Sequence, residues 1–126
     1  MTASARILLA EDDRILRKAG EIALRKSGYL VIVAVDGEDA LAKARAEKPD
    51  LILLDVMMPK FDGFEVLSQL KADAATRDIP VIMLSNLGDD AAVQRAVGHG
   101  ARAFLVKSSL RPDQLAAKVA ETLNRA

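Results

Sequence analysis

Five short apolar runs recur along the chain, separated by longer stretches in which apolar and polar positions are mixed. The runs are Arg6–Ala10, Leu30–Val35, Leu51–Leu54, Val81–Leu84 and Ala103–Val106. Nearly continuous apolarity over so short a run is typical of a strand that is buried on both faces. The pattern therefore predicts five buried strands.

In the intervening stretches, apolar residues return every three or four positions, which indicates amphipathic helices. One stripe contains Ile15, Leu16, Ala19, Ile22 and Ala23; the others are centred on Leu41, Leu67, Ala96 and Val119. Strict alternation of strands and helices implies a parallel sheet with helices on both faces. We therefore expect an α/β (βα)5 fold, a doubly wound five-stranded parallel sheet that forms one domain over residues 1–126. For the strand order we take the flavodoxin-like 2-1-3-4-5, which is common among doubly wound sheets.

Composition narrows the class of protein. The chain has 126 residues, 51% of them hydrophobic, with 18 basic and 18 acidic side chains. It has no basic run, which argues against direct binding of nucleic acid. The lack of cysteine excludes disulfides and thiolate metal sites. No apolar run reaches the roughly 18 residues of a membrane span. With no recognisable secretory signal at the N-terminus, a cytoplasmic location is expected.

Polar residues follow the predicted strands at their carboxyl ends, where open parallel sheets bind ligands. These residues are Glu11, Asp12, Asp13, Asp36, Asp55, Ser85, Asn86 and Lys107. In the order 2-1-3-4-5 the first and third strands are neighbours. We therefore expect the acids after the first strand to converge on Asp55.

Converging carboxylates need a counter-charge, because two of them about 4 Å apart repel by about 4 kcal/mol near a protein surface. The candidate ligands are all oxygens, which favours Mg²⁺ over zinc. Lys107 adds a second positive charge and Ser85 a hydroxyl donor. Together these groups suit a phosphoryl group, and Asp55 is the candidate nucleophile.

The same residues lie in motifs that resemble the response regulator receiver domain of two-component (His–Asp phosphorelay) signalling, of the stand-alone type. The motifs are Ile7–Asp13, Leu54–Pro59, Asp62–Phe64, Met83–Ser85, Gly100-Ala101 and Phe104–Lys107. Their order and spacing together are specific, and the resemblance covers nearly the whole chain.

The resemblance implies that Asp55 is the phospho-acceptor and contributes to an Mg²⁺ site. Asp12 would be the more direct metal ligand, and Glu11 would act through water. The backbone carbonyl of Met57 would complete the protein ligands. A partner sensor histidine kinase or histidine phosphotransfer protein would donate the phosphate.

The resemblance also implies a switch. Ser85 and Lys107 would contact the phosphoryl group, and Phe104 would change rotamer as Ser85 moves. The surface of the fourth helix, fifth strand and fifth helix would then control an output protein that binds non-covalently. A phosphate shuttle in a multi-step relay, or a receiver fragment of a larger regulator, is the alternative. We expect a monomer, which phosphorylation could dimerise, with no membrane partner.

Simpler roles compete for several residues. Asp13 is expected to cap the following helix. Phe104 could be plain core, and His99, between two glycines at a helix end, is expected to interact with the helix dipole. Outside the cluster, Ser85 would be an ordinary loop hydroxyl and Lys107 a solvated charge.

The chain departs from the receiver pattern in three places. The hydroxyl position holds Ser85, where threonine is also common; serine keeps the donor, so switching should survive. Ser108 stands where the family usually has proline, and a non-proline cis bond costs about 3–4 kcal/mol. We therefore predict a trans Lys107–Ser108 bond, or else a visibly strained cis one. Met57 and Leu87 are bulky and apolar beside the expected phosphoryl site, and neither can orient water. We therefore hypothesise slow self-dephosphorylation.

Three other classes of function are weighed. A flavodoxin-like carrier would need a phosphate-cradling loop after the first strand, where this chain has acids. A Mg²⁺-dependent phosphohydrolase would place a second acid two residues after the nucleophile, where this chain has Met57. A degenerate receiver is disfavoured because every chemical position is filled. We therefore expect a switch that takes part in its own phosphorylation, and not an enzyme.

Overall fold

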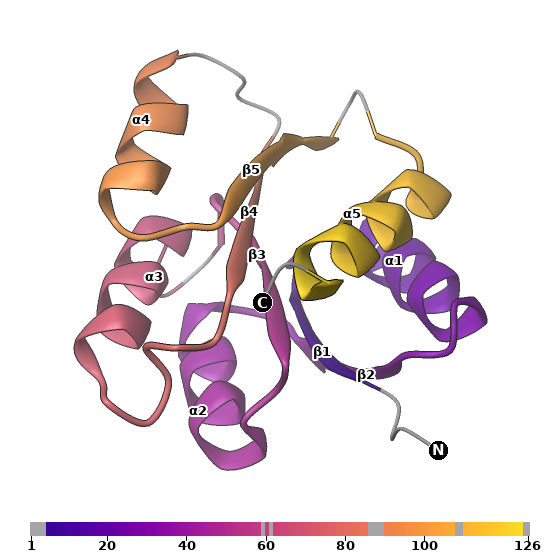
Figure 1. The fold of residues 1–126 in the computed structure, drawn as a ribbon, viewed down its shortest axis with the longest axis horizontal. Coiled ribbons are helices and arrows are strands. Elements are labelled where there is room, and N and C mark those ends of the chain that lie inside the picture. Colours follow the sequence, from indigo (N-terminus) through magenta and orange to yellow (C-terminus); the bar gives the residue numbers. More distant parts are fainter. Residues whose placement is uncertain (1–4, 59, 61, 86–89, 108–109, 125–126) are drawn as a thin grey trace.

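A computed structural model describes residues 5–58, 60, 62–85, 90–107 and 110–124. In this part of the chain, strands and helices alternate strictly, as predicted (Figure 1). The elements are β1 (Arg6–Ala10), α1 (Arg14–Lys26), β2 (Leu30–Ala34), α2 (Gly37–Glu47), β3 (Leu51–Asp55), α3 (Gly63–Ala72), β4 (Val81–Ser85), α4 (Asp90–Gly98), β5 (Ala103–Val106) and α5 (Pro112–Asn124). Leu87 and the Lys107–Ser108 bond lie outside the described residues.

The five strands form one parallel sheet in the order β2-β1-β3-β4-β5, which confirms the predicted topology. The register aligns the carboxyl ends of the strands. Ala10 pairs with Leu54, so the next residues, Glu11 and Asp55, follow neighbouring strands at the same level. The register thus brings the two acidic segments together.

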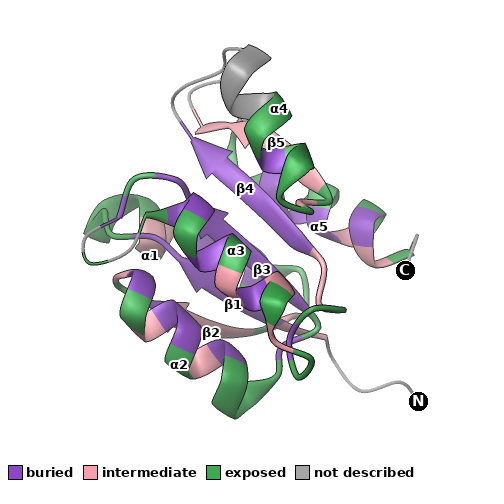
Figure 2. Ribbon diagram, turned by 90° about the vertical axis from the view of Figure 1, so that its left-hand side faces the viewer, coloured by how far each residue is buried: buried purple, intermediate pink, exposed green. Residues whose placement is uncertain are grey.

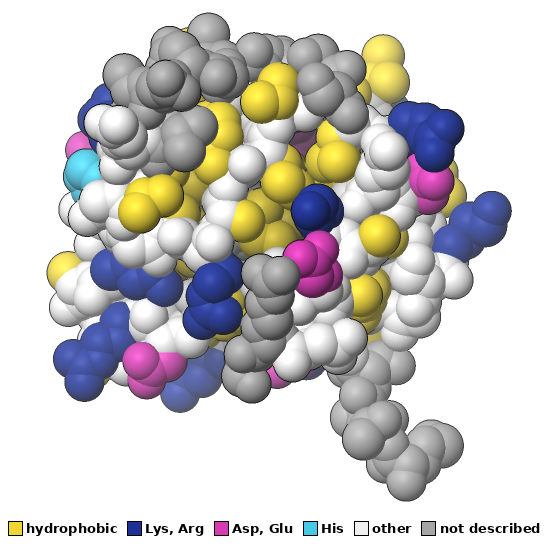
Figure 3. Space-filling view, turned by 45° about the horizontal axis from the view of Figure 1, so that its top comes forward, with side chains coloured by type: hydrophobic (Ala, Val, Ile, Leu, Met, Phe, Trp, Pro, Cys, Tyr) yellow, Lys and Arg dark blue, Asp and Glu magenta, His cyan; other side chains and the backbone are white. Residues whose placement is uncertain are grey.

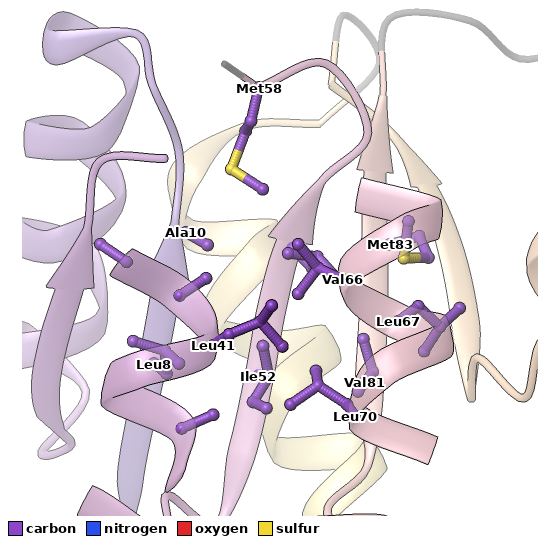
Figure 4. Close-up of a cluster of buried hydrophobic side chains, with 14 of the residues drawn as sticks. Leu8, Ala10, Leu41, Ile52, Met58, Val66, Leu67, Leu70, Val81 and Met83 are labelled. Carbon is purple, nitrogen blue, oxygen red and sulfur yellow. The ribbon is translucent and has the colours of Figure 1, made fainter. Parts of the chain in front are cut away.

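Helices cover both faces of the sheet (Figure 1). On one side, α2, α3 and α4 pack on Leu8 and Ile52, as part of the cluster drawn in Figure 4. On the other, α1 and α5 pack on Leu9 and Leu53. Successive strand residues face opposite sides, so each central strand contributes to both clusters. Near-complete burial of each such side chain contributes about 1.5–3 kcal/mol and keeps the strand ends in place.

Burial separates the central strands from the edge strands (Figure 2). Every residue of β3 and β4 is buried, as are the last four of β1. All four residues of β5 are only half-buried, and β2 has a single buried residue, Ala34. Side chains of β2 and β5 still pack on the core clusters of both faces. Their burial is less complete than predicted, because an edge strand has a neighbour on one side only.

Helix α1 exposes much of its apolar stripe. Ile15 is 80% exposed and Ile22 is 50% exposed, whereas Gly20 and Leu24 are buried. Gly20 packs closely against β1, since a Cβ there would lie 3.1 Å from Leu9 Cδ2. The helical period was correct, but only part of the stripe faces the sheet. Among the described helices, none is long and apolar enough to span a bilayer.

Candidate functional site: an acidic cavity at the carboxyl ends of the strands

Four of the predicted site residues stand at the ends of four neighbouring strands. Asp55 and Ser85 are the last residues of β3 and β4, and Glu11 and Lys107 directly follow β1 and β5. Asp55 is 3%, Glu11 3% and Ser85 1% exposed. Two carboxyl groups are therefore held at the carboxyl ends of the strands with little access to water. Buried charges of this kind need ionic partners.

These residues line one open cavity of about 400 Å³. Its walls are formed by Glu11, Asp12, Asp13, Leu16, Asp55, Met57, Ser85 and Lys107. On the face of the molecule at the top of Figure 1, basic and acidic side chains lie together among hydrophobic ones (Figure 3). The cavity is large enough for an ion and a phosphoryl group, with room for a phosphate donor to approach.

Three carboxylates converge in this cavity as predicted. Ligand oxygens of Glu11, Asp12 and Asp55 all lie within 4.8 Å of one another. Asp12 is exposed and the other two are buried. Oxygens bound to one octahedral Mg²⁺ are at most about 4 Å apart, so a small inward movement would suffice. The donor set and the spacing both fit a hard divalent cation.

Lys107 bridges the two buried carboxylates. Its Nζ lies 2.8 Å from Asp55 Oδ2 and 2.5 Å from Glu11 Oε1. Burial opposes the charge on Lys107, but hydrogen bonds and attraction from both acids outweigh burial and raise the pKa of Lys107 above its ordinary value. Lys107 is thus held as a cation at the centre of the cluster.

Glu11 is the acid that the site perturbs most clearly. Burial, followed by a hydrogen bond with Asp55, raises the pKa of Glu11 from 4.5 to about 7, although Lys107 acts in the opposite direction. Near neutral pH, a substantial fraction of Glu11 therefore holds a proton. A divalent cation would displace this proton, because metal ligands bind deprotonated.

Backbone groups fix the remaining carboxylate oxygens. The Asp13 N–H donates to Glu11 Oε2 and the Met57 N–H donates to Asp55 Oδ1, both at 3.2 Å. The Gly63 N–H donates to the carbonyl oxygen of Val56 at 2.8 Å, which joins the start of α3 to the end of β3. The Asp55 carboxylate is therefore positioned by the main chain as well as by Lys107.

The other sequence-predicted residues occupy defined places. The Asp13 side chain accepts from the N–H groups of Ile15 and Leu16, which confirms it as the N-cap of α1. Phe104 is half-buried against the core cluster on the side of α3. The Met57 side chain is 65% exposed at the cavity.

His99 follows α4, and its Nδ1 lies 2.7 Å from the carbonyl oxygen of Arg95. That contact agrees with a role at the helix end. The ring centroids of His99 and Phe64 are 6.2 Å apart, so His99 also meets α3.

Two residues at the site were not anticipated, and both come from α1. Leu16 forms part of the cavity wall, although its spacing indicated only the apolar stripe of a helix. Arg17 donates from Nη1 to the carbonyl oxygens of Glu11 and Asp12. A basic residue one turn into a helix gives no sequence signal for such a contact, because the contact depends on how the preceding loop turns.

Comparison with known proteins gives a consistent result. A family model described as the response regulator receiver domain matches residues 7–120. A "Probable transcriptional regulator ycf27" from Guillardia theta is 38% identical over 95% of this chain and 46% of its own length. The transcriptional regulatory protein AfsQ1 of Streptomyces coelicolor is 42% identical over 80% of this chain and 44% of its own. The chain thus spans about half the length of these curated relatives.

Solved structures agree. The chemotaxis protein CheY4 of Vibrio cholerae superposes with a TM-score of 0.88 and 31% identity, covering 94% of this chain and 98% of its own. The receiver domain of the Francisella response regulator 1452 has a TM-score of 0.89 and 28% identity, covering 97% and 98%. Together with the sheet order and the acidic cavity, these matches show that the chain belongs to the response regulator receiver domain family.

Proposed function

We propose that this domain is a phosphorylation switch in which Asp55 accepts a phosphoryl group from a phosphohistidine of a partner kinase or phosphotransfer protein. A carboxylate oxygen of Asp55 would attack phosphorus while the P–N bond breaks, and its electron pair would stay on the imidazole. The observation that supports this role is the buried Asp55 carboxylate, paired with Lys107 at 2.8 Å and facing an open cavity.

The acidic cluster would hold Mg²⁺ through Asp12 and Asp55, with Glu11 acting through water and the Met57 carbonyl as a further ligand. Bound there, the ion would neutralise charge on the transferring oxygens. Lys107 needs only to keep its position to meet a phosphoryl oxygen, and Ser85 lines the same cavity. The exposed thioether of Met57 offers no group to orient water, which supports slow loss of the phosphate.

The switch would act on an output partner through α4, β5 and α5. In this proposal Phe104, half-buried on β5 against the core, rearranges when Ser85 moves toward the phosphoryl group. Curated relatives are about twice as long as this chain, so output could pass to a covalently joined domain or to a separate protein. The receiver chemistry at Asp55 is the same in either arrangement.

Phosphotransfer tests the proposal directly. The protein is incubated with Mg²⁺ and acetyl phosphate, and intact mass is measured. Wild type should gain one phosphoryl group and Asp55→Ala none. The matched control is Asp13→Asn, which removes another acid from the same cavity but keeps a capping oxygen, and it should still be phosphorylated. Phosphorylation of Asp55→Ala, or none in wild type, would overturn the assignment.

A further inference from the structure

Glu11 and Asp12 are consecutive, yet both carboxylates reach the point where Asp55 lies. Successive side chains of an extended strand point to opposite faces, so a straight continuation of β1 would direct one of the two away. Their ligand oxygens instead lie within 4.8 Å of each other and of Asp55. The chain must therefore turn directly after β1, and the shape of the cluster depends on what holds this turn.

Arg17 reaches back from α1 to this turn. Its Nη1 donates to the carbonyl oxygen of Glu11 at 2.9 Å and to that of Asp12 at 3.3 Å. One nitrogen can contact two successive carbonyl groups only if both face the same side of the chain. The half-buried guanidinium thus holds the backbone in the conformation that brings the two carboxylates together. Hydrogen bonds from a charged donor are among the stronger ones in proteins.

The neighbouring contacts serve other parts of the loop. Asp13 caps α1 with its side chain, and its N–H holds one oxygen of Glu11. Among the described residues, no carboxylate lies within 4.0 Å of the Arg17 guanidinium. The hydrogen-bonding capacity of Arg17 is therefore directed to the two loop carbonyls and not to an ion pair.

We propose that Arg17 is a positioning residue for the acidic cluster, which it shapes for a divalent cation by fixing the turn between β1 and α1. The inference rests on the proposed function, because it assumes that this cluster binds Mg²⁺. The charge of Arg17 by itself would repel Mg²⁺, whereas its hydrogen bonds would favour binding. The two effects have opposite signs, so a binding measurement separates them.

The test is titration calorimetry with MgCl₂ on wild type, Arg17→Met, Arg17→Lys and Arg14→Met. Arg17→Met should weaken Mg²⁺ binding about 10-fold, since the hydrogen bonds that hold the turn are lost. Arg17→Lys keeps a charged donor and should recover most of the affinity. Arg14→Met removes an equivalent charge from the exposed start of α1 and should leave binding unchanged or slightly tighter. Unchanged or tighter binding by Arg17→Met, or equal losses in Arg17→Met and Arg14→Met, would overturn the proposal.

A second readout needs no metal. In ¹⁵N-labelled protein with EDTA, the Asp13 amide should exchange with solvent several-fold faster in Arg17→Met than in wild type, while amides of β3 and β4 keep their protection. Equal exchange at Asp13 would overturn the positioning role even if wild type failed to bind Mg²⁺. Failure of wild type to bind Mg²⁺, with faster exchange in the variant, would instead refute the metal site and leave the role of Arg17 in shaping the turn supported.

Discussion

At the scale of single residues, the site is a balance of three carboxylates against one ammonium group. Lys107 contacts two of these acids, Glu11 and Asp55, and both are nearly inaccessible to solvent. Burial, followed by a hydrogen bond with Asp55, raises the pKa of Glu11 to about 7, so a proton on Glu11 relieves part of the excess negative charge near neutral pH. In the metal-free protein, the charge of the cluster therefore changes with pH through Glu11.

The raised pKa of Glu11 predicts the pH dependence of stability in the presence of EDTA. Between pH 4.5 and about 7 the folded protein keeps a proton that the unfolded chain releases, so this group stabilises the fold at the acidic end of that range. Stability should fall by on the order of 1 kcal/mol as pH rises through it. Urea titrations at several pH values measure this slope. Glu11→Gln should flatten it, whereas Glu38→Gln, outside the cavity, should not. Equal slopes in wild type and Glu11→Gln would contradict the prediction.

At the scale of elements, the start of α3 is pressed against the end of β3. A Cβ on Gly63 would lie 2.3 Å from the carbonyl oxygen of Asp55 and 2.8 Å from Val56 Cα. Asp62 caps the helix by accepting from the Glu65 N–H at 2.9 Å. The end of β3 and the start of α3 can therefore approach this closely only with glycine at the contact.

Gly63→Ala should destabilise the fold by about 1–3 kcal/mol, because backbone atoms must move to admit a methyl group. The control is Gly98→Ala at the end of α4, where a Cβ meets nothing within 4 Å. Gly98→Ala should be neutral or stabilising by up to about 1 kcal/mol, since alanine favours helix. Chemical denaturation of both variants gives the comparison, and similar effects of the two substitutions would argue against the close contact.

A second contact at this scale joins α3 to α4. The Arg95 guanidinium carbon lies 4.2 Å from the centroid of the Phe64 ring, within the range of a cation–π interaction. Phe64 directly follows Gly63, so α4 contacts the part of α3 that touches the end of β3. The contact is a physical connection between the acidic cavity and the surface of α4.

At the scale of the whole molecule, the two core clusters hold the strand ends rigid, while the charged residues gather where the strands stop. Binding a cation there would couple the cavity to global stability, because the unfolded chain cannot assemble the three carboxylates. Stabilisation by a ligand grows with its concentration relative to Kd, by about 2.7 kcal/mol at 100 times Kd. The melting temperature therefore reports on the site without requiring phosphorylation.

Mg²⁺ should raise the melting temperature of wild type. Variants of the adjacent residues Asp12 and Asp13 should distinguish a metal ligand from a helix cap. Asp12→Ala should be at least as stable as wild type without metal, because it removes repulsion, but should lose most of the Mg²⁺ increment. Asp13→Ala should lower the free energy of unfolding by about 1 kcal/mol, because the helix cap is lost. It should keep the rise in melting temperature that Mg²⁺ causes. Calorimetric melting with and without MgCl₂ measures both. The assignment fails if Asp13→Ala, and not Asp12→Ala, loses the increment.

Much of this molecule could be predicted from the sequence because its signals are local. Apolar runs of strand length located all five strands, and the alternation of runs with helical stripes predicted a parallel sheet with helices on both faces. The acids after β1 and Asp55 after β3 could be placed together, since strand order alone brings them to one edge. The capping role of Asp13 follows from its residue type directly before a helix.

Only the tertiary structure decided how these parts meet. Burial of β2 and β5 depends on their place at the sheet edges, and exposure of Ile15 depends on how α1 rotates against Leu9. Lys107 bridges two carboxylates, and Arg17 donates hydrogen bonds to the turn after β1. The spacing of these residues in the sequence does not determine such contacts. The sequence determined which chemical groups stand at the strand ends, because period and order are properties of the chain. Their charge state and orientation were decided by packing, because desolvation and hydrogen bonding exist only once the chain has folded.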